Sequence, residues 1–221
     1  MKNLHTSKSI LPLLRRTQLL PGESLPSLLE RLAQLNYYPS LRTLNYICYG
    51  NPDTLKNQDN LECPLRVETF LRLSNLTHIS PEDLYAASNH RFVPFLSPPG
   101  QSPMEFPWIG LSSKVMLTNN LAYGCLRSAE AAQYCPHCLN TAAYHRLNWI
   151  PVPAAICLEH GCLLVSQCPN CLKRLSIQEI VRNHCKACQK DLSATEAVSV
   201  KGNFLSQKII QSWFAGTDVT K

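Results

Sequence analysis

Cys135-Pro136-His137-Cys138 is the first of four short knuckles, each with two residues between its two metal-type ligands. The others are Cys157-Leu158-Glu159-His160, Cys168-Pro169-Asn170-Cys171 and Cys185-Lys186-Ala187-Cys188. Each knuckle can supply two ligands from one tight turn, and a tetrahedral zinc ion needs two such turns. The spacing therefore predicts two structural zinc ions bound between residues 135 and 188.

Sequence order predicts how the knuckles pair, although an interleaved pairing would satisfy the same spacing. In sequence order, one ion is held by Cys135, Cys138, Cys157 and His160, and the other by Cys168, Cys171, Cys185 and Cys188. Cys162 lies close enough to His160 to compete for the first ion. We favour His160 because it keeps the two-residue spacing of the other knuckles.

A disulfide framework is the alternative interpretation of these cysteines. The chain has eleven cysteines, an odd number, and no secretory signal precedes them, so zinc is favoured. Protein side chains fill all four positions at each predicted ion, which leaves none for an activated water. The sequence also lacks the HExxH motif and the zinc-deaminase motif. We therefore expect structural zinc, no catalytic residues and no enzyme activity.

Composition and charge are those of a globular chain. Of 221 residues, 45% are hydrophobic, and the formal net charge is +6. Seven thiolates and two Zn²⁺ ions would lower that charge to about +3, so net charge alone supports polyanion binding only weakly. The longest apolar run, residues 149–158, is too short to span a bilayer, and residues 10–14 are too short for a signal peptide. A soluble, cytoplasmic protein without membrane contact is expected.

Two helices are predicted near the N-terminus. In residues 21–36, Ser24 is expected to cap the helix by accepting a backbone amide hydrogen bond, and Pro26 fits the first turn. Leucines then recur at intervals of three and four residues, which predicts an amphipathic helix. A second, shorter helix is expected after Ser40, ending at residues 50–52.

Residues 64–87 have the pattern helix, turn, helix, with Ser80 capping the second helix. A turn of about five residues is close to a helix-turn-helix. Glu82 and Asp83 occupy the start of the second helix, where carboxylates would repel DNA phosphates. We therefore favour protein docking over base reading for this element.

The rest of the chain contains less regular patterns. Short strands are expected at 147–150 and 163–165, and an amphipathic helix near the C-terminus. The predicted divisions are an N-terminal tail (1–20), a helix-turn-helix domain (21–91), a Pro-rich connector (92–116), a first zinc finger with a leading helix over 117–132 (117–166), a second zinc finger (167–200) and a C-terminal helix or tail (201–221).

Basic residues gather in the second predicted finger and are candidates for contact with nucleic-acid phosphates. They are Lys173, Arg174, Arg182, Lys186 and Lys190. A solvated face that only keeps the finger in solution is an equally good interpretation.

Several motifs together resemble the TniQ family of transposon target-selection proteins. They are Pro21-Gly22-Glu23-Ser24, the segment 27–33, Cys135-Pro136-His137-Cys138-Leu139, Tyr144, Trp149, the segment 157–164 and Cys168-Pro169-Asn170-Cys171. The resemblance implies a mainly α fold with small zinc-stabilised α+β modules, in which an N-terminal helix-turn-helix domain precedes tandem zinc fingers.

The same resemblance implies an adaptor in the choice of transposition targets. Such an adaptor binds an AAA+ ATPase regulator and recruits it, and through it the transposase, to a DNA target. The chain is similar to the short forms in CRISPR-associated transposons, where a CRISPR effector with its guide RNA marks the target. Direct contact with RNA or the DNA backbone is a further expectation. The alternative function is a zinc-containing helix-turn-helix transcriptional regulator.

Overall fold

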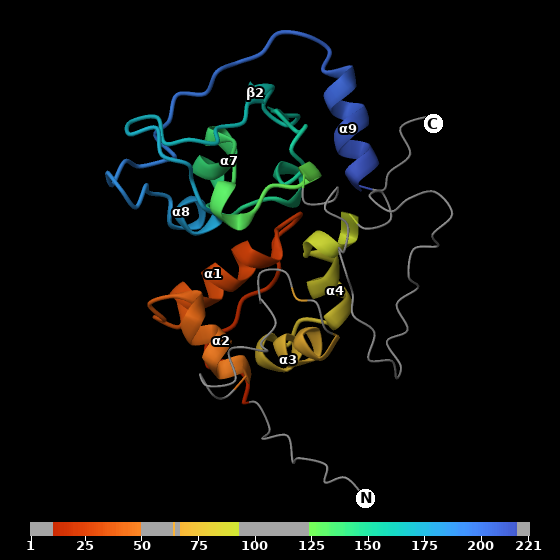
Figure 1. The fold of residues 1–221 in the computed structure, drawn as a ribbon, viewed down its shortest axis with the longest axis vertical. Helices are drawn as coiled ribbons and strands as arrows, with labels where there is room; N and C mark the ends of the chain where they lie inside the picture. Colours follow the sequence, from red (N-terminus) through yellow and green to blue (C-terminus); the bar gives the residue numbers. More distant parts are fainter. Residues whose placement is uncertain (1–10, 50–63, 65–66, 93–123, 216–221) are drawn as a thin grey trace, which may run out of the picture.

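The computed structural model describes residues 11–49, 64, 67–92 and 124–215. These residues are mainly helical, with one small two-stranded sheet. We call the described residues up to 92 the helical unit and residues 124–204 the cysteine-rich unit, which the C-terminal helix follows. Figure 1 shows the two units stacked on each other, with α1 (Leu25–Leu35) and α4 (Pro81–Ala86) at the boundary and the C-terminal helix α9 (Leu205–Ala215) beside the cysteine-rich unit. No helix in the described ranges is long and apolar enough to cross a membrane.

The helical unit is built from the predicted helices. Its elements are α1 (Leu25–Leu35), α2 (Leu41–Tyr49), α3 (Val67–Thr77), α4 (Pro81–Ala86) and the 3₁₀ helix η2 (Asn89–Phe92). The apolar stripe of α1 is fully buried at Leu25, Leu28 and Leu32, where it packs with residues of α2, α3 and α4. The predicted helices at 21–36 and after Ser40 are thus confirmed, while the expected stop at 50–52 lies outside the described residues.

The start of α4 follows the predicted capping pattern. The Ser80 hydroxyl accepts a hydrogen bond from the Asp83 amide at 3.0 Å, and Pro81 occupies the first turn. Only residues 78–80 separate α3 from α4, a shorter turn than expected. The two helices pack together, and their assignment as a helix-turn-helix that docks a protein partner stays a prediction.

Ser24 does not cap α1, contrary to the prediction. Its side chain makes no capping hydrogen bond, and its hydroxyl lies 3.0 Å from Nδ1 of the buried His145 instead. His145 is 121 residues away from Ser24 in the sequence, so the residues around Ser24 do not predict this hydrogen bond. A tertiary hydrogen bond has replaced the local one.

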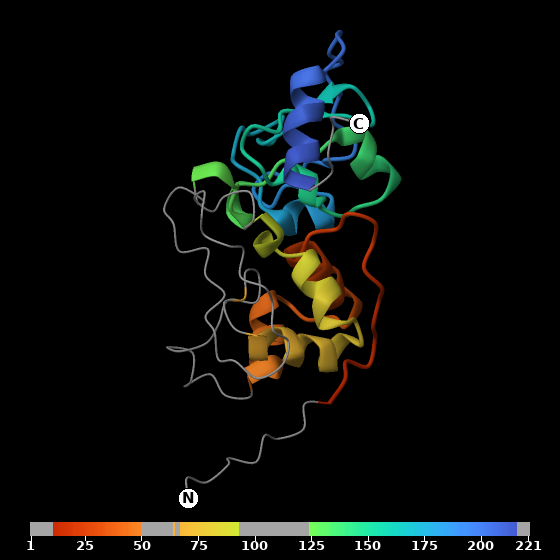
Figure 2. The ribbon, with the colours of Figure 1, turned by 90° about the vertical axis from the view of Figure 1, so that its right-hand side faces the viewer.

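Residues 11–20, expected as part of a tail, lie against the helical unit (Figure 2). Leu13 is 3% exposed within the core, and its amide donates to the Leu76 carbonyl at 2.9 Å. Further along, Arg31 of α1 donates to the Thr17 hydroxyl at 2.8 Å. This segment therefore covers one side of the helical unit.

The cysteine-rich unit contains short elements joined by irregular chain. They are η3 (Ala129–Ala131), α7 (Pro136–Thr141), η4 (Leu147–Trp149), β1 (Ile156–Cys157), β2 (Cys162–Leu163) and α8 (Ile177–Arg182). The strands are antiparallel, with Ile156 opposite Leu163 and Cys157 opposite Cys162. Its core contains Tyr134, Trp149 and Leu175 together with six buried cysteines, which are Cys135, Cys138, Cys157, Cys162, Cys168 and Cys185. Cys171 and Cys188 are partly buried and pack against this core.

Two predicted elements in this unit are wrong over the described residues 126–132 and 147–150, while residues 124 and 125 are helical as expected. Residues 126–132 are not helical apart from the 3₁₀ turn η3, because Leu126 forms a bridge to Pro151 and the Ala132 amide donates to the Leu175 carbonyl. The first part of the expected helix, 117–123, lies outside the described residues. The expected strand at 147–150 is the 3₁₀ helix η4.

The C-terminal helix is confirmed as α9 and packs against both units. The Gln207 side chain accepts from the Ala155 amide at 2.9 Å, and the Gln211 side chain donates to the Ile156 carbonyl at 2.7 Å. Near the end of the helix, Phe214 meets Phe92 of the helical unit edge to face, with ring centroids 5.6 Å apart. Apart from Phe92, the predicted connector 92–116 lies outside the described residues.

Candidate metal centres

The first cluster combines a helix start with a hairpin turn. Cys135 is the N-cap of α7, and its sulfur accepts the Cys138 amide at 3.5 Å. Cys157 ends β1, and the chain turns through His160 and Gly161, whose φ of 59° lies in the left-handed region that favours glycine. The two knuckles therefore present four donors toward one point.

Distances within the first cluster match those around a single tetrahedral ion. His160 Nδ1 lies 3.5 Å, 3.3 Å and 3.5 Å from the sulfurs of Cys135, Cys138 and Cys157, and the last two sulfurs are 3.7 Å apart. Zinc bonds of about 2.3 Å to sulfur and about 2.0–2.1 Å to nitrogen would separate tetrahedral donors by about 3.5–3.8 Å. The four donors can thus hold one metal ion.

The second cluster is built from two knuckles with the same turn. Leu172 and Gln189 have φ of 60° and 59°, and their amides donate to the carbonyls of Cys168 and Cys185. Sulfur–sulfur distances are 3.5 Å from Cys168 to Cys188 and 3.7 Å from Cys171 to Cys185. In the described part of the chain, both clusters have the sequence-order grouping, and within each cluster the donors lie within 4.8 Å of one another.

The environment of the second cluster shifts the pKa values of two of its thiols in opposite directions. A hydrogen bond from the Asn170 side chain is the largest cause that lowers the pKa of Cys188 to about 6. Burial is the largest cause that raises the pKa of Cys185 to about 12. Since metal binding requires thiolates, occupation of this cluster must release protons.

Cys162 is a fifth donor beside the first cluster. It is fully buried, and its sulfur lies 3.4 Å from that of Cys135. From the sequence, Cys162 is expected only as an alternative to His160 as a ligand of the first ion. The structure places His160 within the set of four and Cys162 next to it.

The Pro-Gly-Glu-Ser motif joins the helical unit to the segment that separates the two knuckles of the first cluster. The Ser24 amide donates to the His145 carbonyl at 3.0 Å, and the Leu147 amide donates to the Gly22 carbonyl at 2.8 Å. The Tyr144 hydroxyl donates to the Pro21 carbonyl at 3.1 Å. The motif therefore acts as a connection between units as well as a helix start.

A buried carboxylate makes a second connection, between α1 and α8. Glu30 is 1% exposed, and its Oε1 accepts from Arg182 Nε at 2.6 Å, while Gln178 Nε2 lies 3.4 Å from both carboxylate oxygens. Arg182, a candidate for nucleic-acid contact, is thus held by Glu30. The structure leaves Lys173, Arg174 and Lys186 exposed and Lys190 half-buried.

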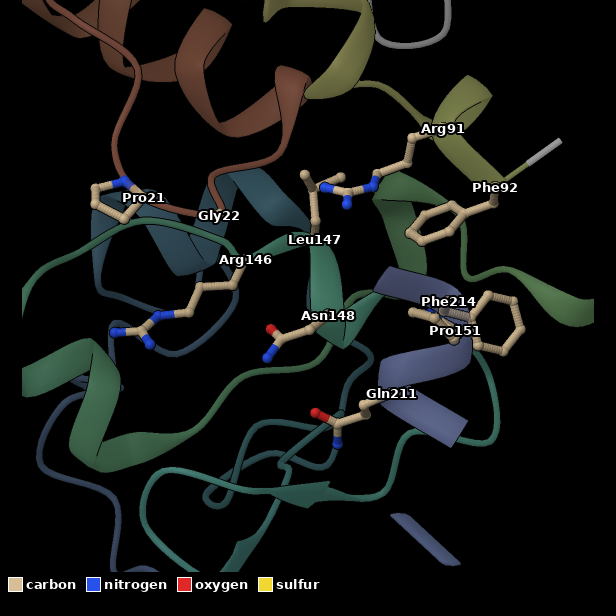
Figure 3. Close-up of a pocket in the computed structure, with 10 residues that line it drawn as sticks. All are labelled: Pro21, Gly22, Arg91, Phe92, Arg146, Leu147, Asn148, Pro151, Gln211 and Phe214. Carbon is tan, nitrogen blue, oxygen red and sulfur yellow. The ribbon is translucent and has the colours of Figure 1, made fainter. Parts of the chain in front are cut away.

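A cavity of about 240 Å³ lies where the two units and α9 meet (Figure 3). Phe92, Leu147 and Phe214 form apolar parts of its wall, and Arg91 and Arg146 add basic groups. Burial lowers the pKa of Arg91, and Arg146 is paired with Glu159. No short sequence motif predicts this cavity, because four separate segments line it.

Comparison with known proteins identifies the family. The TniQ family profile matches residues 14–164, more than half of the chain, including α1 to α4 and the whole first cluster. A search among curated proteins finds no match. TniQ proteins are associated with transposition and are generally non-catalytic. The second cluster lies beyond the matched residues, so its assignment rests on its own geometry. From the extent of the match, this chain belongs to the TniQ family.

Proposed function

We propose that this chain is a cytoplasmic, non-catalytic adaptor in the selection of transposition target sites. The observation that carries the proposal is the TniQ match, which spans both the helical unit and the first cluster. The adaptor would bind an AAA+ ATPase regulator and recruit it, and hence the transposase, to a target marked by an RNA-guided CRISPR effector. Several weak contacts made together would raise the local concentration of the partners.

Two structural zinc ions would brace this adaptor. The proposed ligands are Cys135, Cys138, Cys157 and His160 for one ion, and Cys168, Cys171, Cys185 and Cys188 for the other. Structural zinc contributes about 10 kcal/mol or more per site in zinc-finger peptides, comparable to the whole stability of a domain. With so little regular structure in the cysteine-rich unit, this contribution would decide whether the unit folds.

The proposed division of labour follows the predicted domains. Residues 21–91 would dock a protein partner, and the fingers at 117–166 and 167–200 would form the second half of the platform. Lys173, Arg174 and Lys186 are exposed, so they can reach RNA or the DNA backbone without breaking a contact in the described residues. The two connections made by Pro-Gly-Glu-Ser and by Glu30 would keep the partners at a fixed separation.

A transcriptional regulator remains the second candidate function because α3 and α4 are consecutive, packed helices. It predicts tight binding of the isolated protein to a short duplex, with specificity that survives physiological salt. The adaptor instead predicts weak duplex binding alone and a stable complex when an AAA+ transposition regulator and ATP are added to DNA.

Co-sedimentation of purified components on DNA tests the proposal. We expect the wild-type protein and Cys125→Ser to join the ATPase–DNA complex, since Cys125 lies outside both clusters. Cys171→Ser should lose one zinc and fail to join, because its second finger no longer folds. Wild-type protein that binds a specific duplex tightly without the ATPase would support the regulator instead. A Cys171→Ser protein that loses one zinc but still joins would contradict the proposed role of the second finger.

A further inference from the structure

The hairpin of the first cluster carries more metal donors than one ion can use from it. Cys157 and Cys162 are directly opposite each other in the antiparallel register, so their side chains lie on the same face of the hairpin. His160 lies in the turn between them. A tetrahedral ion that already has Cys135 and Cys138 needs only two of these three donors.

The distances indicate which donors would bind the ion in the observed arrangement. His160 Nδ1 is within 3.5 Å of three cluster sulfurs, whereas Cys162 approaches the cluster at the Cys135 sulfur, 3.4 Å away. Among the four proposed ligands His160 is also the most solvent-accessible, while Cys162 is completely buried. The His160 imidazole is therefore the ligand that can dissociate into solvent most easily. The Cys162 thiol already lies next to the coordination position that His160 would vacate.

We infer that Cys162 is a reserve ligand, which completes a four-thiolate site when His160 leaves the first ion. The inference rests on the proposed zinc occupancy of this cluster. In the exchange, the bond from zinc to His160 Nδ1 breaks and a bond from zinc to Cys162 Sγ forms. The Cys162 thiol proton passes to solvent, and His160 leaves as a neutral imidazole, so no oxidant or reductant is needed. The exchange would free a histidine in the hairpin turn without loss of the metal.

Metal counting on the wild type, three variants and one control tests this inference. Native mass spectrometry of the zinc-loaded full chain should find two zinc ions in the wild type, in His160→Ala and in Cys162→Ser. The double variant should hold one. Cys125→Ser serves as the matched control for removal of a cysteine outside the clusters and should hold two. Far-UV circular dichroism measured in parallel shows whether each variant is folded.

Cobalt absorption identifies the ligand that replaces His160. Thiolate-to-cobalt charge-transfer absorption increases with the number of bound thiolates, which would rise from seven to eight over the two sites, by about one seventh. We expect this rise in His160→Ala and an unchanged spectrum in Cys162→Ser. The inference is overturned if His160→Ala loses a zinc or fails to fold, if its charge transfer does not rise, if Cys162→Ser loses a zinc, or if the double variant keeps two. Fewer than two zinc ions in the wild type would instead contradict the proposed cofactor.

Discussion

At the scale of single residues, His145 shows how the connection between units depends on protonation. Its ring is completely buried, and burial lowers its pKa from 6.5 to about 3. Its backbone amide donates to the Ser27 hydroxyl, and its Nδ1 is hydrogen-bonded to Ser24. The Trp149 ring system packs edge to face with it, with centroids 5.6 Å apart. The folded protein therefore holds this histidine neutral.

The neutral His145 makes stability depend on pH. Because the unfolded chain takes up this proton near pH 6.5 and the folded chain only near pH 3, stability is lost as pH falls between those values. The loss is about 1.4 kcal/mol per pH unit, or about 1.4 kcal/mol between pH 7.5 and 5.5. His145→Asn keeps an acceptor for Ser24 and does not titrate there. Urea unfolding at both pH values should show the wild type losing about this much more than the variant, since any zinc loss affects both. Equal losses in the two proteins would show that His145 is already charged when folded.

At the scale of elements, the predictions that succeeded depend on local patterns. The leucine stripe of α1 and the cap of α4 are written within one or two helical turns, and both are confirmed. The strand predicted at 147–150 is wrong because the Leu147 amide is bonded to Gly22, far away in the sequence. The short helix α8 was not predicted, although Ser176 and Glu179 form a complete capping box that was a usable signal.

The candidate sites also differ in whether local sequence patterns or distant residues determine them. Knuckle spacing predicted the eight proposed metal ligands because each pair of donors is local, and the structure groups them in sequence order. In contrast, the partner of Arg182 is Glu30, 152 residues away. Charge patterning along the chain makes Arg182 a candidate for nucleic-acid contact, because no residue near it in the sequence indicates that its partner is a buried carboxylate of the helical unit.

The ion pair between α1 and α8 should stabilise the packing of these helices. Arg182→Ala would leave the carboxylate of Glu30 buried, with Gln178 as its remaining side-chain partner among the described residues, so we expect a loss of about 2–3 kcal/mol in the free energy of unfolding. Arg174→Ala, at an exposed arginine of the same finger, should change it by less than about 0.5 kcal/mol. Adding Glu30→Gln to Arg182→Ala should recover part of the loss, because it removes the buried charge. Chemical denaturation of the zinc-loaded proteins measures all three, and equal effects of the two arginine substitutions would contradict the role of this pair.

At the scale of the whole molecule, the two units have different sources of stability. The helical unit has its own apolar core, in which Leu28, Phe70 and Leu84 are fully buried. The buried core of the cysteine-rich unit instead includes five of the proposed metal ligands, Cys135, Cys138, Cys157, Cys168 and Cys185. Metal occupancy should therefore control one unit directly and reach the other only through the elements at the boundary, chiefly α1.

Removal of zinc should unfold the molecule unevenly. We expect a chelator to remove hydrogen-exchange protection from the amides of α7 and α8, because structural zinc contributes about 10 kcal/mol or more per site, which such short elements cannot replace. Protection of α3 should persist, since its partners α2 and α4 belong to the helical unit, and protection of α1 should fall partly because α8 no longer covers it. Hydrogen exchange with mass spectrometry resolves these segments, and chelator already saturated with zinc is the control. Loss of protection in α3 together with α8 would show one cooperative unit, and full protection of α8 without metal would show that zinc does not stabilise this fold.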